Sequence, residues 1–289
     1  MGTLEIPEPL NRTQVESLIE LALQEDLPQG DITSLLTVPE DNRASATFLA
    51  KSDGVLCGGP VAKLVFEKVD PELVCAFHVA DGEVITSGMK LGIVSGSTRS
   101  ILSAERIALN FLQRLSGVAT YAAEAKRLAP DVTLLDTRKT LPGWRSLEKY
   151  AAKVGGITNH RMHLGDMIMI KDNHIDACGG DIAETLKQVK AGRPEGIKIE
   201  MEVRSIDELR IALDGAADIV MLDNMDDALT KEALGVIASH SHTPYIEASG
   251  GITPERANRL GKMGVDAVSM SAFTTKATHL DISLDLIIS

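Results

Sequence analysis

A dense group of basic side chains lies between residues 136 and 174, and it is the part of the chain best suited to chemistry. The group consists of Arg138, Lys139, Arg145, Lys149, Lys153, His160, Arg161, His163, Lys171 and His174. The whole chain carries a formal net charge of −12, so a dense group of positive side chains is unusual in it. Acidic proteins gather positive side chains where something negative is held. The segment therefore predicts a site for a small polyanion such as a phosphate ester or a dicarboxylate.

Two strand ends within this segment place cations where they could act. Arg138 and Lys139 follow an apolar run at 132–135 and precede a Pro-Gly turn, so they could grip a carboxylate or phosphate, or they could be solvated loop cations. Lys171 ends the apolar run 166–170. It could bind an anion, form an aldolase-type Schiff base, or belong to a structural ion pair. His160 and Arg161 lie in the loop between these strands, where a surface role is the plain alternative.

Carboxylates and glycines complete the candidate site. Glu200 and Glu202 alternate on one predicted strand and so share a face, and Asp223 closes the next strand. Such carboxylates could hold Mg²⁺, stabilise positive charge, or simply pair with the cations. Ser249, Gly250 and Gly251 follow a later strand and precede a predicted helix. Backbone N–H groups at such a turn can cradle a phosphate, although an ordinary strand-to-helix turn also uses glycine.

The elements that must position these residues change character along the chain. A helix is expected over 13–25 with Thr13 as its N-cap, followed by a turn at 30–34, short strands and a helix at 60–69. Residues 103–128 are expected to form one long helix, or two helices with a break near Ser116 and Gly117. Beyond Pro130, strands alternate with helices, with strands expected at 132–135, 166–170, 197–203, 218–222, 245–248 and 265–270. This alternation predicts parallel βαβ units in which the strand ends, including Asp136 and Ser271, ring one mouth.

The sequence thus predicts an α/β fold: an open or incomplete (β/α) barrel over residues 116–275, preceded by an N-terminal α+β sandwich domain over 1–115 that residues 276–289 could join. The low aromatic content of 3% suits helix-on-sheet layers. Nucleic acid is an unexpected partner for so acidic a chain. No apolar run approaches the roughly 20 residues that span a bilayer. The N-terminus lacks a secretory pattern, and three scattered cysteines fit the reducing cytoplasm.

Several ordered motifs resemble the quinolinate phosphoribosyltransferase family. They are ERIALNFLQRLSGVAT, DTRKTLPGWRSLEKYA, NHRMHLGDMIMIKDNH, EVRSIDE, IVMLDNM and EASGGI, and the resemblance runs from EDLPQGDIT to LDISLDL. It implies a pentosyltransferase of de novo NAD synthesis. The ring nitrogen of quinolinate attacks C1 of 5-phosphoribosyl 1-pyrophosphate, and nicotinate mononucleotide, pyrophosphate and CO₂ are formed with Mg²⁺ as cofactor. It also implies a homodimer, or a hexamer built as a trimer of dimers, with sites shared between subunits.

The same resemblance implies roles for individual residues. Arg138, His160, Arg161 and Lys171 would bind the quinolinate carboxylates, with Thr137 beside them and Lys139 between them and the pyrophosphate. Arg106 would reach the neighbouring subunit's site. Glu202 and Asp223 would lie near the metal and ribose, and Lys139, Lys171, Glu202 and Asp223 would form the catalytic set. Ser249, Gly250, Gly251 and Ser271 would contact phosphate.

The chain departs from the family pattern in its last phosphate loop. Ser271 and Thr275 stand where members usually carry glycine and histidine, and GGITNHR lacks one usual glycine. Three alternatives to the quinolinate enzyme therefore stay open. They are a related transferase of the molybdenum-transport-associated kind, an aldolase-type lyase using Lys171, and a non-catalytic anion-binding protein.

Overall fold

The computed structural model describes residues 7–8 and 10–287. The chain divides into two compact units. The first contains residues 1–124, 140–156 and 272–289, and the second contains residues 125–139 and 157–271. The predicted boundary at 115/116 falls inside a long helix, and the segment 140–156, expected in the barrel, belongs to the first unit.

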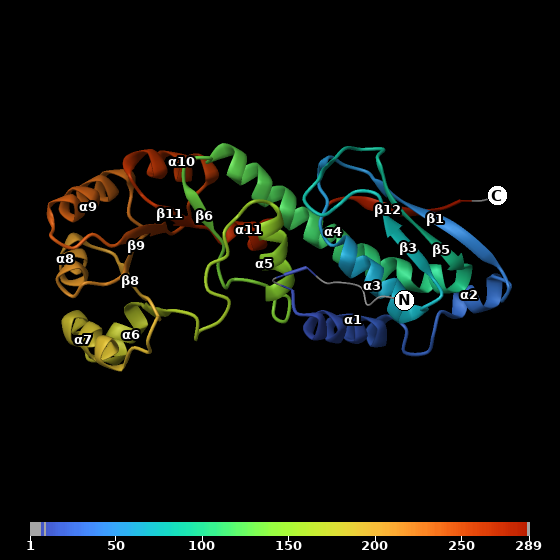
Figure 1. The fold of residues 1–289 in the computed structure, drawn as a ribbon, viewed down its shortest axis with the longest axis horizontal. Helices are drawn as coiled ribbons and strands as arrows, with labels where there is room; N and C mark the ends of the chain where they lie inside the picture. Colours follow the sequence, from blue (N-terminus) through green and yellow to red (C-terminus); the bar gives the residue numbers. More distant parts are fainter. Residues whose placement is uncertain (1–6, 9, 288–289) are drawn as a thin grey trace. The chain divides into compact units, whose positions relative to one another are not determined.

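The first unit is built on a four-stranded antiparallel sheet in the order β12 (Ile282–Ile287), β1 (Arg43–Ala50), β5 (Lys90–Ser97) and β3 (Val74–Phe77). The strands β2 (Gly54–Val55) and β4 (Val84–Ile85) form a separate pair. Strand β12 pairs with β1 (Figure 1), so residues 282–287 join the first sheet. Phe48 is fully buried and contacts the rings of Phe66 and Phe77, with which it forms part of the core of this unit.

Two helices of the first unit begin at polar side-chain caps. Helix α1 (Arg12–Asp26) starts one residue earlier than predicted, because the side chain of Asn11, and not Thr13, accepts the N–H of Gln14 at 3.2 Å. Part of the predicted turn is helix α2 (Ile32–Thr37), which Asp31 caps through the N–H of Ser34. Helix α3 (Gly59–Val69) follows, close to its predicted bounds.

Helix α4 (Thr98–Leu128) is continuous, which confirms the prediction of one long helix over the alternative with a break near Gly117. A Cβ at Gly117 would lie 1.8 Å from the carbonyl oxygen of Thr278. Glycine is required there for close approach of backbone, and its helix-breaking tendency is overridden by packing. Helix α5 (Arg145–Val154) and helix α11 (Ala272–Thr275) contact each other in the same unit.

A buried ion pair links helices α4 and α5. The guanidinium of Arg114 binds the carboxylate of Glu148, which is fully buried, and also donates to the carbonyl oxygens of Thr274 and Ala277. The other carboxylate oxygen of Glu148 accepts the N–H of Leu141 at 3.0 Å. The pair therefore fixes two connecting segments against the helices of the first unit.

The second unit contains a six-stranded parallel sheet, flanked by helices (Figure 1). Its order is β6 (Thr133–Leu135), β11 (Ala267–Ser269), β10 (Tyr245–Ser249), β9 (Ile219–Asp223), β8 (Ile199–Val203) and β7 (Ile168–Ile170). Its helices are α6 (Asp172–Ala177), α7 (Ile182–Gly192), α8 (Ile206–Asp214), α9 (Asp227–Ser239) and α10 (Pro254–Met263). Six parallel strands with β6 and β7 at the edges confirm the prediction of an open α/β barrel with an N-terminal α+β domain.

The strand register puts the candidate polar residues on one face of this sheet. Glu202 and Glu247 both pair with Met221 of the central strand β9, and Glu200 lies one row below. Ser249 pairs with Asp223 at the carboxyl ends of their strands. Because side chains alternate between faces along a strand, residues in these rows project to the same side. The barrel therefore collects acidic residues from two strands beneath its carboxyl-end face.

Candidate functional site

A cavity of about 300 Å³ opens at the carboxyl ends of the parallel strands. All of its lining belongs to the second unit, namely Asp136, Thr137, Arg138, Lys139, His160, Arg161, Met169, Lys171, Met221, Ser249 and Ser269. Pockets of this size hold small molecules, and the carboxyl-end face is where such barrels bind their ligands. The lining includes four Lys or Arg side chains, so the cavity suits an anion.

Two arginines in the lining keep unused hydrogen-bond donors. The Nε atoms of Arg138 and Arg161 are buried and have no hydrogen-bond partner among the described residues. Burial lowers the pKa of Arg161, and the positive charge of Arg138 lowers it further. Two guanidinium groups that repel each other beside a cavity are stabilised by an anion that pairs with both, and carboxylates suit the guanidinium fork.

Arg161 is held in place by its neighbours in the loop. Its Nη1 donates to the carbonyl oxygen of Met167 at 2.9 Å. The preceding part of the loop is fixed by Asp136, a fully buried residue that accepts the N–H of His160 at 2.8 Å and the side-chain amide of Asn159 at 2.6 Å. Asp136 thus shapes the loop that carries Arg161.

Lys171 and Glu202 form an ion pair at the ends of β7 and β8. Lys171 lines the cavity, whereas Glu202 is not among the lining residues and reaches the site through this pair. The carboxylate of Asp223, at the end of β9, accepts the side-chain amide of Asn224 at 2.7 Å. These contacts place Lys171 as a fixed charge at the cavity wall, with carboxylate oxygens behind it.

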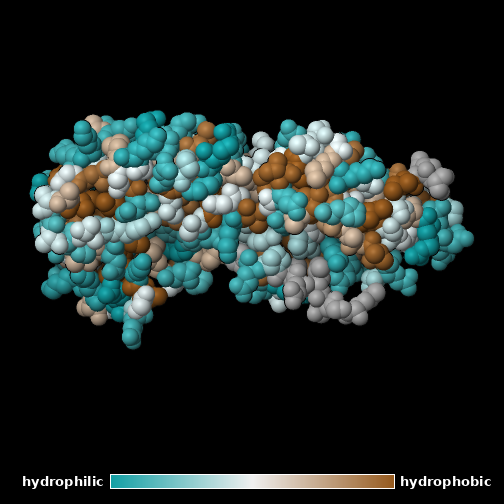
Figure 2. Space-filling model, turned by 45° about the horizontal axis from the view of Figure 1, so that its top comes forward, coloured by the Kyte–Doolittle hydropathy of each residue, from teal (hydrophilic) through white to brown (hydrophobic). Residues whose placement is uncertain are grey.

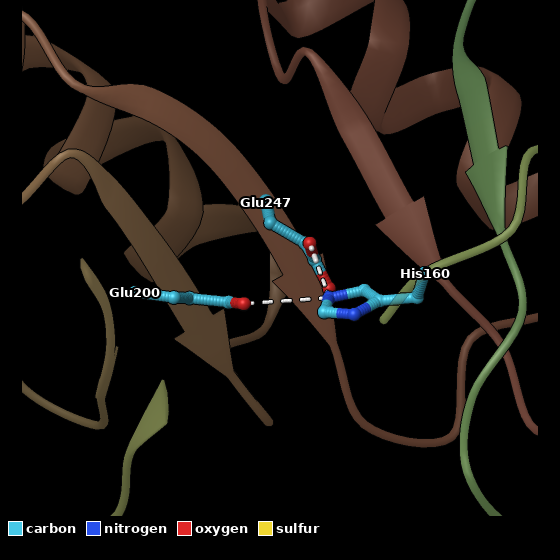
Figure 3. Close-up of side chains that lie close together, drawn as sticks. All are labelled: His160, Glu200 and Glu247. Carbon is cyan, nitrogen blue, oxygen red and sulfur yellow. Dashed lines mark ion pairs between the residues drawn. The ribbon is translucent and has the colours of Figure 1, made fainter. Parts of the chain in front are cut away.

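The side chains of His160, Glu200 and Glu247 form a cluster (Figure 3), in which the two glutamates are buried and His160 also lines the cavity. The Nε2 atom of His160 is 3.3 Å from a carboxylate oxygen of Glu200 and 3.3 Å from one of Glu247. Glu200 is 0% exposed and Glu247 is 1% exposed. Figure 3 shows the two carboxylates reaching the same ring nitrogen from strands β8 and β10. The two glutamates therefore share one imidazole.

The protonation of this cluster is unusual. Burial lowers the pKa of His160, but hydrogen bonds with Glu200 and Glu247 outweigh burial and raise the pKa to about 9. Burial raises the pKa of Glu200. His160, Glu200 and Glu247 therefore titrate together, and the cluster keeps a proton that the same groups would release if they were far apart. The N–H of Arg161 points at Nδ1 of His160 at 2.8 Å, which leaves only Nε2 for a ring proton, so we place the additional proton on a carboxylate.

The glycine turn after β10 lies against the end of β9. Gly250 has a φ of +101°, and a Cβ on it would lie 2.3 Å from the side-chain oxygen of Asn224. Asn224 itself donates its N–H to the carbonyl oxygen of Ser249 at 2.9 Å. Glycine at 250 is therefore required both by conformation and by space. Thr253 caps helix α10 directly after this turn.

The structure brings together about half of the predicted site residues. Seven line the cavity, namely Thr137, Arg138, Lys139, His160, Arg161, Lys171 and Ser249. Six do not line it, namely Arg106, Glu202, Asp223, Gly250, Gly251 and Ser271. Arg106 is exposed on helix α4 in the first unit. Strand β11 ends at Ser269, one residue before the predicted end at Met270, and Ser269 lines the cavity in place of Ser271.

Sequence reasoning missed four lining or supporting residues. Met169, Met221 and Ser269 line the cavity, and Glu247 completes the buried cluster. The methionines and Ser269 looked like core residues of their strands. Alternation along β10 would have placed Glu247 on the same side as Ser249, but its partner His160 is 87 residues away in sequence and gives no local signal.

Comparison with known proteins identifies the fold and both parts of the chain. The family model described as "Quinolinate phosphoribosyl transferase, C-terminal domain" matches residues 118–285. The corresponding N-terminal domain model matches residues 31–116. The two matches meet at the predicted domain boundary, although the helix that crosses it is continuous.

Similar proteins match along nearly the full chain. The mitochondrial quinolinate phosphoribosyltransferase [decarboxylating] 2b of Nicotiana tabacum is 40% identical, over 98% of this chain and 86% of its own. The probable nicotinate-nucleotide pyrophosphorylase [carboxylating] of Bacillus subtilis is 37% identical, over 97% and 96%. The crystal structure of NadC from Streptococcus pyogenes superposes with a TM-score of 0.90 at 36% identity, over 97% of this chain and 99% of that one. With its open barrel, its cationic cavity and these full-length matches, this chain belongs to the quinolinate phosphoribosyltransferase family.

Proposed function

We propose that this protein transfers the phosphoribosyl group of 5-phosphoribosyl 1-pyrophosphate to quinolinate, with loss of CO₂, to give nicotinate mononucleotide and pyrophosphate. The observation that carries the proposal is the pair of unused Nε donors on Arg138 and Arg161 beside the cavity. Quinolinate has two adjacent carboxylates, which supply the two anions that these mutually repelling guanidinium groups need. The names of the relatives described above fit the same reaction.

The cavity residues would act mainly by positioning and by neutralising charge. Arg138, Arg161 and Lys171 hold the dicarboxylate so that its ring nitrogen, as a free lone pair, faces C1 of the donor. Lys139 lies at the exposed side of the lining, where it can neutralise the departing pyrophosphate. Orientation and electrostatic stabilisation of this kind provide most of the rate in transfers with a stable anionic leaving group. Once the ring nitrogen carries positive charge, it accepts the electrons that decarboxylation releases.

The proposal includes Mg²⁺ bound with the donor. Glu202 and Asp223 close neighbouring strands on the same sheet face and offer the carboxylate oxygens that this ion prefers. When bound, Mg²⁺ neutralises charge on the pyrophosphate. The pairing of Glu202 with Lys171 and of Asp223 with Asn224 keeps both carboxylates in place before substrates enter.

We also propose that the protein forms a homodimer, or a hexamer as a trimer of dimers. Apolar patches interrupt the hydrophilic surface in Figure 2. Large apolar side chains are exposed on the first unit at Leu21, Ile32, Leu35, Leu36, Val74 and Val84. Exposed apolar groups of this kind mark contact surfaces. Arg106 would enter the partner's site across such a contact. Sedimentation measurements would test the assembly.

The location of the protein stays a prediction. Within the described residues, none of the helices is both long and apolar enough to cross a membrane. We propose a cytoplasmic enzyme, whereas the names of plant relatives assign those proteins to mitochondria or chloroplasts. Microscopy of a tagged protein in its own cells would decide between these compartments.

The ion pair of Lys171 with Glu202 argues against the aldolase-type alternative, because a Schiff base requires a free amine. The direct test is incubation with quinolinate, the phosphoribosyl donor and Mg²⁺, followed by measurement of pyrophosphate, CO₂ and nicotinate mononucleotide. Arg161→Ala should lose activity with quinolinate, whereas Arg210→Ala, an exposed control on α8, should keep it. Absence of products with the unaltered protein would reject the proposal. Turnover of nicotinate in place of quinolinate would favour a related transferase of altered substrate.

A further inference from the structure

Two buried glutamates beside His160 have no part in the reaction described above. Glu200 and Glu247 are 0% and 1% exposed. Both carboxylate oxygens of Glu200 and Oε1 of Glu247 lack a hydrogen-bond partner within the described part of the chain. Taking a carboxylate out of water costs several kcal/mol unless charges or hydrogen bonds compensate nearby. The groups that provide this compensation show what the two carboxylates hold in place.

The compensating group is the ring of His160, which links the carboxylates to the cavity wall. Its Nε2 faces both carboxylates at 3.3 Å (Figure 3), and its Nδ1 accepts the backbone N–H of Arg161 at 2.8 Å. Both ring nitrogens are therefore already engaged. Although His160 lines the cavity, neither nitrogen is left to donate to a ligand there.

The same cluster favours the charge of Arg161. The negative charge of Glu200 acts to raise the pKa of Arg161, opposing the lowering caused by burial and by Arg138. The backbone of Arg161 is fixed by His160, its Nη1 is fixed by the carbonyl oxygen of Met167, and its Nε remains unused. The cluster thus sets both the location and the electrostatic surroundings of a guanidinium whose free donor lies at the cavity.

We propose that Glu247 and Glu200 are positioning residues that act through His160 to hold Arg161 in the geometry that binds the dicarboxylate substrate. The inference rests on the proposed function. It assigns His160 a supporting role in place of the direct substrate contact expected from the family resemblance. It also predicts that the effect of altering Glu247 passes through Arg161.

A double-mutant cycle tests this route, with kcat/KM for quinolinate as the readout because it can be followed over many decades. Glu247→Gln keeps the shape of the side chain and replaces its carboxyl group with an amide. We expect it to lower kcat/KM for quinolinate about 10-fold, which corresponds to about 1.4 kcal/mol, and to leave the KM for the phosphoribosyl donor within about two-fold. In an Arg161→Ala background, the same change should alter kcat/KM less than about two-fold, because coupled residues are not additive.

Glu232→Gln is the matched control, because Glu232 is exposed on helix α9, and it should change nothing. Thermal unfolding of each variant checks folding, and Glu200→Gln replaces Glu247→Gln in the cycle if the latter does not fold. An unchanged kcat/KM in Glu247→Gln, or the same loss in both backgrounds, would overturn the positioning role. If the unaltered protein does not turn over quinolinate at all, the proposed function fails instead.

The cluster atoms lie within 4.8 Å of one another, a spacing that could also hold a metal ion. Elemental analysis of the purified protein separates this case from the positioning role. We expect the unaltered protein and Glu247→Gln to have the same metal content. One equivalent of metal in the unaltered protein, absent from Glu247→Gln, would overturn the hydrogen-bonded arrangement.

Discussion

Replacing Arg138 by methionine should weaken substrate binding without weakening the fold. Arg138 lines the cavity, and its buried Nε makes no hydrogen bond within the described residues. Its charge also opposes that of Arg161, whose pKa it lowers. The substitution therefore removes little that stabilises the ligand-free protein. It also removes the repulsion between Arg138 and Arg161, which by itself should raise stability.

The magnitude follows from the hydrogen bond that the free donor can form. A hydrogen bond between charged partners contributes about 1.5 to 3 kcal/mol. Loss of one such bond to a quinolinate carboxylate weakens binding roughly 10- to 150-fold. Loss of a second bond from the same guanidinium fork would add to this, because arginine often pairs with carboxylates through two bonds.

Titration calorimetry with quinolinate, in the absence of the phosphoribosyl donor, measures the dissociation constant directly. Thermal unfolding of the ligand-free protein measures the change in stability. Arg210→Met is the control, since Arg210 is exposed on helix α8. Tight binding by Arg138→Met would refute the assignment of its free donor to the substrate. A clear fall in the stability of the ligand-free variant would show instead that Arg138 holds the fold.

Three further predictions concern the fold and the buried cluster. Gly117→Ala should lower the free energy of unfolding by about 1 to 3 kcal/mol in urea, because its Cβ would meet the Thr278 carbonyl at 1.8 Å; Gly235→Ala, in open space on α9, should raise it by about 0.5 to 1 kcal/mol. Arg114→Met should lower the free energy of unfolding by about 3 to 5 kcal/mol, because it leaves the buried carboxylate of Glu148 without its ion-pair partner. A smaller decrease would show that water reaches that carboxylate. The cluster of His160, Glu200 and Glu247 keeps its additional proton up to about pH 9, above the pKa near 6.5 of an unfolded histidine, so the stability that this proton contributes is complete below about pH 6.5 and is lost as pH rises through 9. Melting temperatures from pH 6 to 10 should show this loss in the unaltered protein and a smaller one in Glu247→Gln, and equal losses would refute it.

Much of the barrel followed from sequence because its strands carry a local signal. The apolar runs at 132–135 and 218–222 agree with β6 and β9 to within one residue at each end. Polar residues follow both runs and mark where the strands end, beginning with Asp136 after the first and Asp223 and Asn224 after the second. The cations of the site were visible for a related reason. Arg138 and Lys171 follow strand ends, and strand ends in a parallel sheet meet at one face whatever the order of the strands.

The tertiary structure alone decided which of these residues contact one another. The sheet order places β8 and β10 on either side of β9, which brings Glu200 and Glu247 to one ring nitrogen of His160. Segment 140–156 joins the first unit because Glu148 pairs with Arg114, 34 residues earlier in the chain. Alternation within a strand fixes the face that a side chain takes, since it depends on neighbouring residues. Which distant segments contact one another depends on how the whole chain packs, so no local sequence pattern predicts it.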